Sequence, residues 1–203
     1  MSLRQIPNLI TIARMLAVLP LLWWLRQGEY RPALATALIA GLSDGVDGWL
    51  AKRYGWRTRL GGLLDPIADK VLLDGSFVGL WLAGAAAAPA HPALAALAHP
   101  GAAPLWLLLL VLGRDAVIVA GASAYHFMIG PLKGQPTLLG KVTTVAQIAL
   151  VLALLCELAW PWLPENTADI AIWIVAALTL ASGLDYVIRW SLKTRQVLRE
   201  RAP

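Results

Sequence analysis

Long apolar stretches recur along the chain, separated by short polar segments, and few charged residues lie inside them. By residue number these six stretches cover about 8–25, 30–50, 64–84, 104–130, 139–163 and 168–192. Each is close to the length of about 20 residues that an α-helix needs to cross the hydrocarbon core of a bilayer. The pattern therefore predicts an all-α integral membrane protein, a bundle of six transmembrane helices.

The polar segments between these stretches leave no room for a soluble second domain, so we treat residues 1–203 as a single membrane domain. A short interfacial segment is expected at the N-terminus, and a basic cytoplasmic tail at 193–203. The Ala/Pro/His-rich stretch at 85–103 is biased in composition, and we expect a loop there. A cleavable signal peptide is the alternative for the N-terminus, but Arg14 interrupts the first apolar stretch and no A-x-A site ends it cleanly.

Composition agrees with a membrane protein. Hydrophobic residues make up 59% of the chain and the mean hydropathy is +0.66, far above the balance of a soluble globular protein. The single cysteine, Cys156, excludes a disulfide within one chain and is expected to be a small core residue of the fifth helix.

A net charge of +5 is compatible with nucleic-acid binding, but the basic residues are distributed as in a membrane protein. With six spans, the side opposite the termini carries only Arg26 and Arg31. The side that holds both termini carries Arg4, Lys52, Arg53, Arg57, Arg59, Lys133, Lys141, Lys193, Arg195, Arg199 and Arg201. An excess of Lys and Arg marks the cytoplasmic side. We therefore expect a multi-pass protein of a bacterial inner membrane with cytoplasmic termini, and we exclude nucleic acid as a partner.

Aspartates gather around the second and third apolar stretches, although ionisable residues are costly within a membrane and are usually functional there. They are Asp44, Asp47, Asp65, Asp69 and Asp74. The first four form two pairs, spaced three and four residues apart, which places each pair on one helix face. A short basic loop joins the two helices, so we expect them to pack antiparallel with both pairs at the same depth. Four carboxylates would then converge.

Four carboxylates at one point repel each other unless protons or cations neutralise them. Oxygen ligands suit hard ions such as Mg²⁺, Mn²⁺ or Ca²⁺, and the chain has no Cys/His set for zinc. Two metal ions about 4 Å apart are a known solution for phosphoryl displacement. Helix caps and solvated loop charges are the alternative interpretation of the same aspartates.

Small residues accompany the carboxylates. Gly48 and Ala51 lie four and seven positions after Asp44, on the same face of the helix. The missing side chains would leave room there for a planar base or a diphosphate. Close packing against another helix is the alternative for these small residues.

The run from Asp44 to Asp69 reads Asp-x2-Asp-Gly-x2-Ala-Lys-x8-Gly-x3-Asp-x3-Asp, with Gly61 as the second spaced glycine. This run resembles the signature of the CDP-alcohol phosphatidyltransferases. Lys52 stands where that family usually has arginine. A lysine meets a phosphate as a point charge, without the bidentate fork of arginine, and the adjacent Arg53 is the alternative phosphate-binding cation.

The similarity to this family extends along nearly the whole chain. The pattern Pro7-Asn8-x2-Thr11-x2-Arg14 is similar to the motif that opens the first span in the family, and six spans is the family's usual number. Counterparts are also found for Arg114, Asp115, Lys141 and the stretch 182–186.

The resemblance implies a site for two divalent cations, Mg²⁺ or Mn²⁺, held by Asp44, Asp47, Asp65 and Asp69, with Asp69 also acting as general base. The cytidine diphosphate of the donor would lie along Asp44, Asp47, Gly48, Ala51, Lys52, Arg53 and Gly61. Enzymes of this family transfer the phosphatidyl group of CDP-diacylglycerol to an alcohol at the bilayer surface and release CMP. They commonly form homodimers.

The acceptor alcohol is less narrowly indicated. Basic residues in or near the cytoplasmic half of the last three helices would suit a phosphate on the acceptor. These residues are Arg114, Lys133, Lys141 and Arg189. Snorkelling at the interface is the alternative for Lys133 and Arg189. Gly-Arg-Asp at 113–115 and the motif at 193–198 look more like the cardiolipin synthases of the family, which favours phosphatidylglycerol as acceptor, with glycerol 3-phosphate as the alternative.

A cation-coupled transporter is the main alternative of another class, but it predicts acids spread through the midplane and an internal repeat. The acids cluster at one boundary instead, and no repeat is seen. His91 and His99 have no paired ligands, so no metal role is expected for them. Glu157 and Asp185 lie in apolar stretches and are not assigned, although Asp185 is one helical turn before Arg189 and is expected to pair with it.

Overall fold

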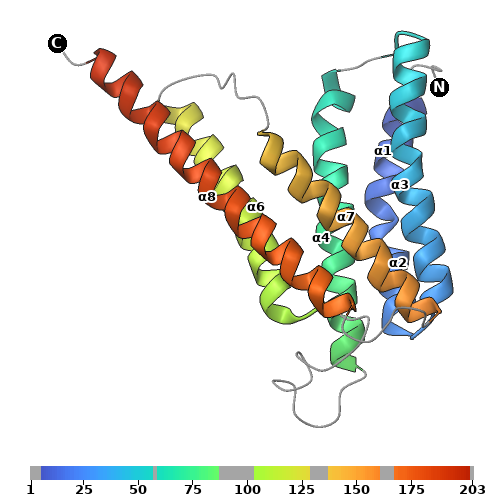
Figure 1. The fold of residues 1–203 in the computed structure, drawn as a ribbon. Coiled ribbons are helices and arrows are strands. Elements are labelled where there is room, and N and C mark those ends of the chain that lie inside the picture. The colour runs from blue at the N-terminus through green and yellow to red at the C-terminus, as the bar shows by residue number, and fades with distance from the viewer. Residues whose placement is uncertain (1–5, 57–58, 87–102, 129–136, 161–166, 202–203) are drawn as a thin grey trace. The chain divides into compact units, whose positions relative to one another are not determined.

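The structure is a computed structural model that describes residues 6–56, 59–86, 103–128, 137–160 and 167–201. Within these ranges every regular element is an α-helix (Figure 1). The helices are α1 (Ile6–Leu16), α2 (Val18–Arg26), α3 (Tyr30–Arg53), α4 (Arg59–Ala86), α6 (Leu105–Met128), α7 (Leu138–Ala159) and α8 (Thr167–Arg201). The all-α prediction is confirmed for the described residues. The N-terminal interfacial segment, most of the predicted loop at 85–103 and Lys133 lie outside them.

Four helical segments are long and apolar enough to cross a membrane, by length and composition. They are Ile6–Arg26, Leu105–Tyr125, Leu138–Ala159 and Thr167–Thr194. Helices α3 and α4 carry the aspartates and several basic residues, which lower the mean hydropathy of both helices. A membrane protein is therefore supported, whereas six spans remain a prediction.

The chain divides into two compact units, and each is described by itself. The first comprises Met1–Leu105 and Val151–Ala168, and the second comprises Trp106–Leu150 and Asp169–Pro203. The first unit contains α1 to α4 and therefore all four paired aspartates. The second contains α6, α8 and the first part of α7.

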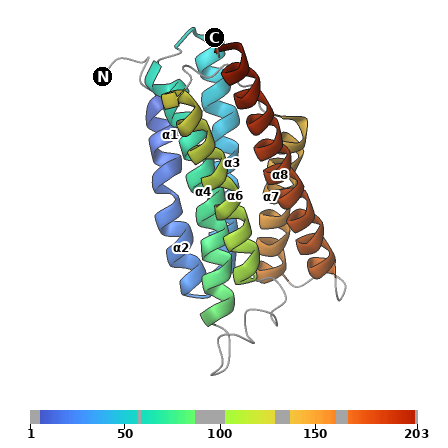
Figure 2. The same ribbon diagram turned by 90° about the vertical axis from the view of Figure 1, so that its left-hand side faces the viewer.

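In the first unit, α1 and α2 follow one another in the same direction with an interruption at Ala17 (Figure 2). Pro20 explains the interruption, because it has no N–H to donate to the carbonyl of Leu16 and its ring crowds that carbonyl. The predicted first span is thus two short helices.

Helices α3 and α4 run antiparallel, as expected (Figure 1). They make little direct contact with each other. Instead, α1 and α2 both pack extensively against α3 and against α4. The two aspartate pairs therefore face a third helix that lies between them.

Glycines on α4 allow α2 to approach closely. A Cβ added to Gly75 would lie 2.5 Å from Cγ1 of Val18, and one added to Gly79 would lie 2.5 Å from Cδ1 of Leu25. Real Cβ atoms do not come that close to another atom, so side chains at these two positions would require Val18 and Leu25 to shift. The buried residues Leu21 and Phe77 complete the apolar core at this contact.

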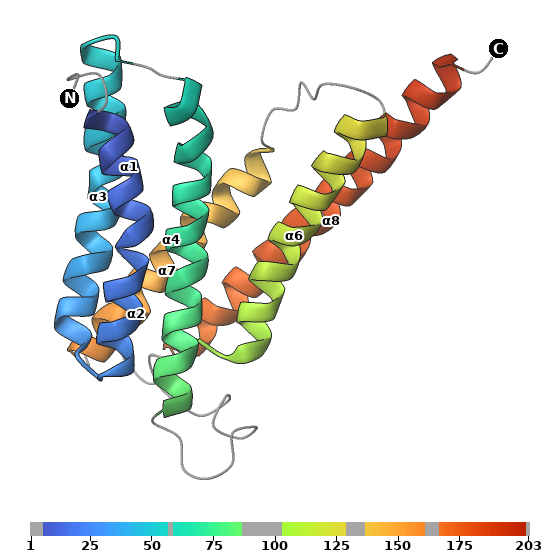
Figure 3. The same cartoon turned by 180° about the vertical axis from the view of Figure 1, so that it is seen from behind.

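In the second unit, α6 and α8 lie side by side and run parallel (Figure 3). The rings of Trp106 and Trp173 stack with centroids 4.9 Å apart, and further along both helices the Tyr186 hydroxyl donates to the carbonyl of Ile118 over 3.2 Å. Helix α7 contacts α8 through the buried Gln147, whose amide Nε2 donates to the Thr179 hydroxyl over 3.1 Å. Helix α8 does not end at the predicted boundary but continues through the predicted tail to Arg201.

Candidate active site

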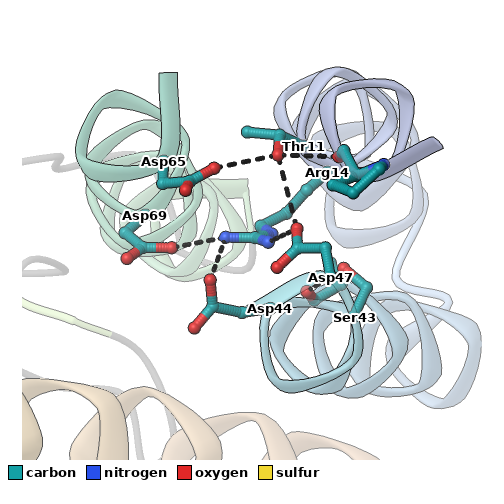
Figure 4. Close-up of polar contacts among 9 residues, drawn as sticks. Thr11, Arg14, Ser43, Asp44, Asp47, Asp65 and Asp69 are labelled. Atoms are coloured by element: carbon teal, nitrogen blue, oxygen red, sulfur yellow. Dashed lines mark hydrogen bonds and ion pairs between the residues drawn. The ribbon is translucent and has the colours of Figure 1, made fainter. Parts of the chain in front are cut away.

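The candidate site lies where α1, α3 and α4 meet, and a single arginine occupies its centre (Figure 4). Thr11 and Arg14 are three residues apart on α1 and therefore share one face of that helix. Both are buried, and the Arg14 side chain has no exposed surface. This places a cation where the two aspartate pairs meet.

Three of the four paired aspartates bind this arginine. Nη1 of Arg14 donates to Oδ1 of Asp44 and to Oδ1 of Asp69, both over 2.6 Å. Its Nη2 donates to Oδ2 of Asp47. Carboxylates from two different helices thus share one guanidinium group, and charge-assisted hydrogen bonds of this kind are stronger than neutral ones.

The fourth aspartate, Asp65, is tied to the same face of α1 by a hydroxyl. Oγ1 of Thr11 lies 3.0 Å from Oδ1 of Asp65, 3.3 Å from Oδ2 of Asp47 and 3.0 Å from the carbonyl of Pro7. One hydroxyl has a single proton, so it can donate to only one of these oxygens at a time. The predicted convergence of the four aspartates is therefore observed, with α1 as the connecting element.

The four carboxylates differ in exposure. Asp47 is 6% exposed, whereas the side chains of Asp44 and Asp69 are 50% and 56% exposed although each is bound to Arg14. The cluster is thus closed on the side of α1 and open on the side of Asp44 and Asp69. A ligand can reach it from that open side.

The role of Arg14 was not predicted from the sequence. It was recognised only as part of the motif that opens the first span, together with Asn8 and Thr11. The signal that could have revealed it is a charged residue inside an apolar stretch, since such a charge requires a partner.

The donor set fits a divalent metal ion in its chemistry. Four carboxylates supply only oxygen, as hard cations prefer. However, among the described residues no group of three His, Cys, Asp or Glu side chains is arranged to hold a metal ion. The Arg14 guanidinium binds carboxylate oxygens of three of these aspartates. Of the described aspartates, Asp44, Asp47, Asp65 and Asp69 are the residues that would hold metal.

The predicted nucleotide-binding residues extend from these aspartates along α3. A Cβ added to Gly48 would have no described atom within 4 Å apart from its own helix, so close helix packing does not explain this glycine. Lys52 and Arg53 are both exposed at the end of α3, one turn beyond Gly48, and Gly61 is buried near the start of α4. Lys52 and Arg53 are therefore both accessible to a phosphate.

The predicted acceptor residues differ in their burial and in their partners. Arg114 is almost buried and donates from Nη1 to Asp115 over 2.6 Å and from Nη2 to the Ser182 hydroxyl over 2.9 Å. Arg189 forms the expected ion pair with Asp185, at 2.6 Å. Lys141 is exposed at the start of α7. Lys133 lies outside the described residues.

Comparison with known proteins gives consistent matches along the chain. The model of the family described as CDP-alcohol phosphatidyltransferase matches residues 4–181. The chain is 32% identical over 211 residues to CDP-diacylglycerol–glycerol-3-phosphate 3-phosphatidyltransferase 1, chloroplastic, of Oryza sativa subsp. japonica, covering 92% of this chain and 57% of that protein. It is 26% identical over 212 residues to the cardiolipin synthase (CMP-forming) of Homo sapiens, covering 96% and 64%.

A third relative is of similar length to this chain. The CDP-diacylglycerol–glycerol-3-phosphate 3-phosphatidyltransferase of Bacillus subtilis is 29% identical over 209 residues, covering 94% of this chain and 98% of that protein. By contrast, the chain spans 57% of the length of the rice relative and 64% of the human one. Relatives of both kinds, glycerol-3-phosphate 3-phosphatidyltransferases and a cardiolipin synthase, thus match more than nine-tenths of this chain.

Proposed function

Because the chain belongs to the CDP-alcohol phosphatidyltransferase family, we propose that it transfers the phosphatidyl group of CDP-diacylglycerol to a glycerol-headed alcohol and releases CMP. One observation carries this proposal. The aspartates of both halves of the signature, on α3 and on α4, converge on one buried cation although 18 positions separate Asp47 from Asp65. A stability role alone does not require four acids at one point.

Asp44, Asp47, Asp65 and Asp69 would hold two divalent cations, Mg²⁺ or Mn²⁺. Bound there, the cations would supply positive charge to a diphosphate and to the CMP leaving group. The open space beside Gly48 would receive the cytidine diphosphate, which would extend along α3 past Ala51 with Lys52 or Arg53 at its phosphates. The diacyl tails would stay in the bilayer.

Asp69 would act as the general base. Its carboxylate is more than half exposed, on the open side of the cluster, where an acceptor hydroxyl can approach. Asp69 takes the proton of that hydroxyl, and the acceptor oxygen attacks the phosphorus that bears diacylglycerol. The bond from that phosphorus to the oxygen shared with CMP breaks, and CMP leaves with the electron pair. An alcohol is a weak nucleophile at neutral pH, so the base is needed.

For the acceptor we favour phosphatidylglycerol, which gives cardiolipin, and glycerol 3-phosphate is the alternative. Arg114 supports a phosphate-bearing acceptor as a buried cation on α6. Its Nε is buried without a hydrogen-bond partner among the described residues. Lys133, Lys141 and Arg189 are secondary candidates for the same phosphate.

We also propose the arrangement in the membrane. Six spans, with both termini and the aspartate cluster on the cytoplasmic side of a bacterial inner membrane, fit the excess of Lys and Arg on that side. The chain is proposed to act as a homodimer, as is common in the family.

The test uses purified protein in detergent with CDP-diacylglycerol, Mg²⁺ or Mn²⁺, and either phosphatidylglycerol or glycerol 3-phosphate. CMP release and the lipid product are both measured. We expect CMP with at least one acceptor, and the lipid product then identifies which. Absence of CMP above background with both acceptors would contradict the proposal.

Replacing Asp69 with Asn tests the base directly. Loss of a positioned base should lower kcat by about 10²- to 10⁴-fold, because Asn cannot accept the proton. The matched control is Glu29→Gln, which removes an exposed carboxylate just before α3 that caps nothing with its side chain. Its kcat should match that of the unchanged protein. If kcat is unchanged in Asp69→Asn, a residue other than Asp69 must act as the general base.

A further inference from the structure

Arg14 is the most completely buried cation among the described residues, and its position needs an explanation. It makes three ion pairs within the candidate site and has no exposed side-chain surface. The reaction proposed above assigns it no step. A charge inside a membrane helix is costly, so a cation held there against three carboxylates has a role toward those carboxylates.

The energetic reason lies in the acids themselves. Two carboxylate oxygens, on Asp44 and Asp69, lie within 2.6 Å of the same nitrogen atom, so the negative charges of α3 and α4 are held close together. Without a cation between them, these charges repel and push the two helices apart. Since α3 and α4 make little direct contact, the packing of both helices on α1 and α2 has to oppose that repulsion.

A metal ion would need the same atoms. Arg14 binds Oδ1 of Asp44, Oδ2 of Asp47 and Oδ1 of Asp69, which are carboxylate oxygens of three of the four predicted metal ligands. The exposed oxygens of Asp44 and Asp69 offer a metal a route from the open side, opposite to α1. The guanidinium and the metal would then compete for the shared oxygens and repel each other.

We propose that Arg14 is a positioning residue that serves as a built-in counter-cation: it assembles the four carboxylates before metal binds, and metal binding displaces it from them. This inference rests on the proposed metal site. Removing Arg14 should strengthen metal binding and destabilise the metal-free protein. Removing a residue that only stabilises the fold would not strengthen metal binding.

The experiment measures Mn²⁺ binding by electron paramagnetic resonance and thermal unfolding in excess EDTA, for purified protein in lipid nanodiscs. For Arg14→Gln we expect Mn²⁺ to bind on the order of 10-fold more tightly, within the usual range of coupling between sites, because the competing charge is gone. In EDTA the same variant should unfold at a lower temperature, and Mn²⁺ should raise that temperature more than it does for the unchanged protein.

Two variants serve as controls. Arg26→Gln removes an exposed arginine at the end of α2, and it should leave both the Mn²⁺ affinity and the unfolding temperature in EDTA unchanged. Arg14→Lys keeps one charge but has a single nitrogen that cannot bridge as many oxygens, so both measurements should fall between those of the unchanged protein and Arg14→Gln.

Weaker or unchanged Mn²⁺ binding in Arg14→Gln would overturn the inference while leaving the proposed metal site intact. Absence of Mn²⁺ binding to the unchanged protein would overturn the proposed site and this inference with it. If Arg14→Gln does not fold, the inference is tested instead by measuring amide hydrogen exchange of α1 in the unchanged protein, with and without Mn²⁺. Exchange over residues 6–16 should increase when Mn²⁺ is added if Arg14 is displaced, and a decrease overturns the inference.

Discussion

Single residues show where inference from the sequence succeeds and where it stops. The four aspartates could be assigned because spacing of three or four on a helix is a local property that the sequence displays directly. The ion pair of Asp185 with Arg189 was predicted for the same reason and is confirmed. The positions of Thr11 and Arg14 between the aspartate pairs depend on which helix packs between α3 and α4. No local pattern contains that information.

Thr11 offers a test at the scale of one hydroxyl group. Thr11→Val keeps the shape but removes the hydroxyl that lies 3.0 Å from Asp65, so Asp65 should lose its link to α1. A lost hydrogen bond to a charged group corresponds to about 1.5–3 kcal/mol, and we expect kcat/KM to fall by about 10- to 100-fold, measured by CMP release.

The control for this change is Thr36→Val on α3. The Thr36 hydroxyl donates to the carbonyl four residues earlier, Pro32, over 2.8 Å, as the Thr11 hydroxyl can to Pro7 at 3.0 Å. Among the described residues, Thr36 makes no hydrogen bond to an aspartate. Thr36→Val should therefore leave kcat/KM close to that of the unchanged protein. Equal losses in both variants would mean that the local bond to the carbonyl, rather than Asp65, explains the effect.

At the scale of helices, the pattern of apolar and polar residues predicted which segments are helical, since each span requires about 20 residues. It did not predict the interruption at Ala17, although Pro20 is a visible signal, nor the continuation of α8 to Arg201. It also did not predict that α1 and α2 separate α3 from α4. Hydropathy specifies the length of a span. Which helices pack against it depends on the shapes of the side chains at the contact, as at Gly75 and Gly79.

The contact of α2 with α4 can be tested through Gly75. A Cβ there would lie 2.5 Å from Val18, so Gly75→Val should force the two helices apart. Overpacking of this kind destabilises by about 1–3 kcal/mol, and we expect a lower unfolding temperature in detergent. Gly41→Val is the control, because a Cβ at Gly41 meets no described atom within 4 Å outside its own helix. Unfolding of the two variants at equal temperatures would refute close packing as the cause.

At the scale of the whole molecule, composition alone indicated a membrane protein, and four of the described helical segments meet the length and hydropathy of a span. Helices α3 and α4 do not meet the hydropathy of a span, because they carry the charges that the proposed chemistry requires. The same residues that make the candidate site recognisable thus weaken the evidence for the spans that hold it. Orientation rests on the distribution of Lys and Arg, which is a property of the sequence.

Reporter fusions test that orientation in bacteria. A fluorescent protein attached after Pro203 should fold and fluoresce, because the C-terminus is predicted to be cytoplasmic. Alkaline phosphatase inserted within 85–103 should be active, because this segment is predicted to lie on the opposite side, where its disulfides can form. The reverse pattern, a dark C-terminal fusion and an inactive phosphatase insertion, would invert the proposed topology.

The burial of Arg14 on α1 also bears on the order of synthesis. Helix α1 leaves the ribosome before α3 and α4, so its arginine enters the bilayer before the acids that neutralise it have been made. An ionised arginine without a partner is costly inside an inserting apolar helix. The inserted α1 is therefore destabilised by its unpaired arginine until the chain has been synthesised as far as Asp69. Once α3 and α4 are present, their aspartates neutralise Arg14 and the helices can pack stably.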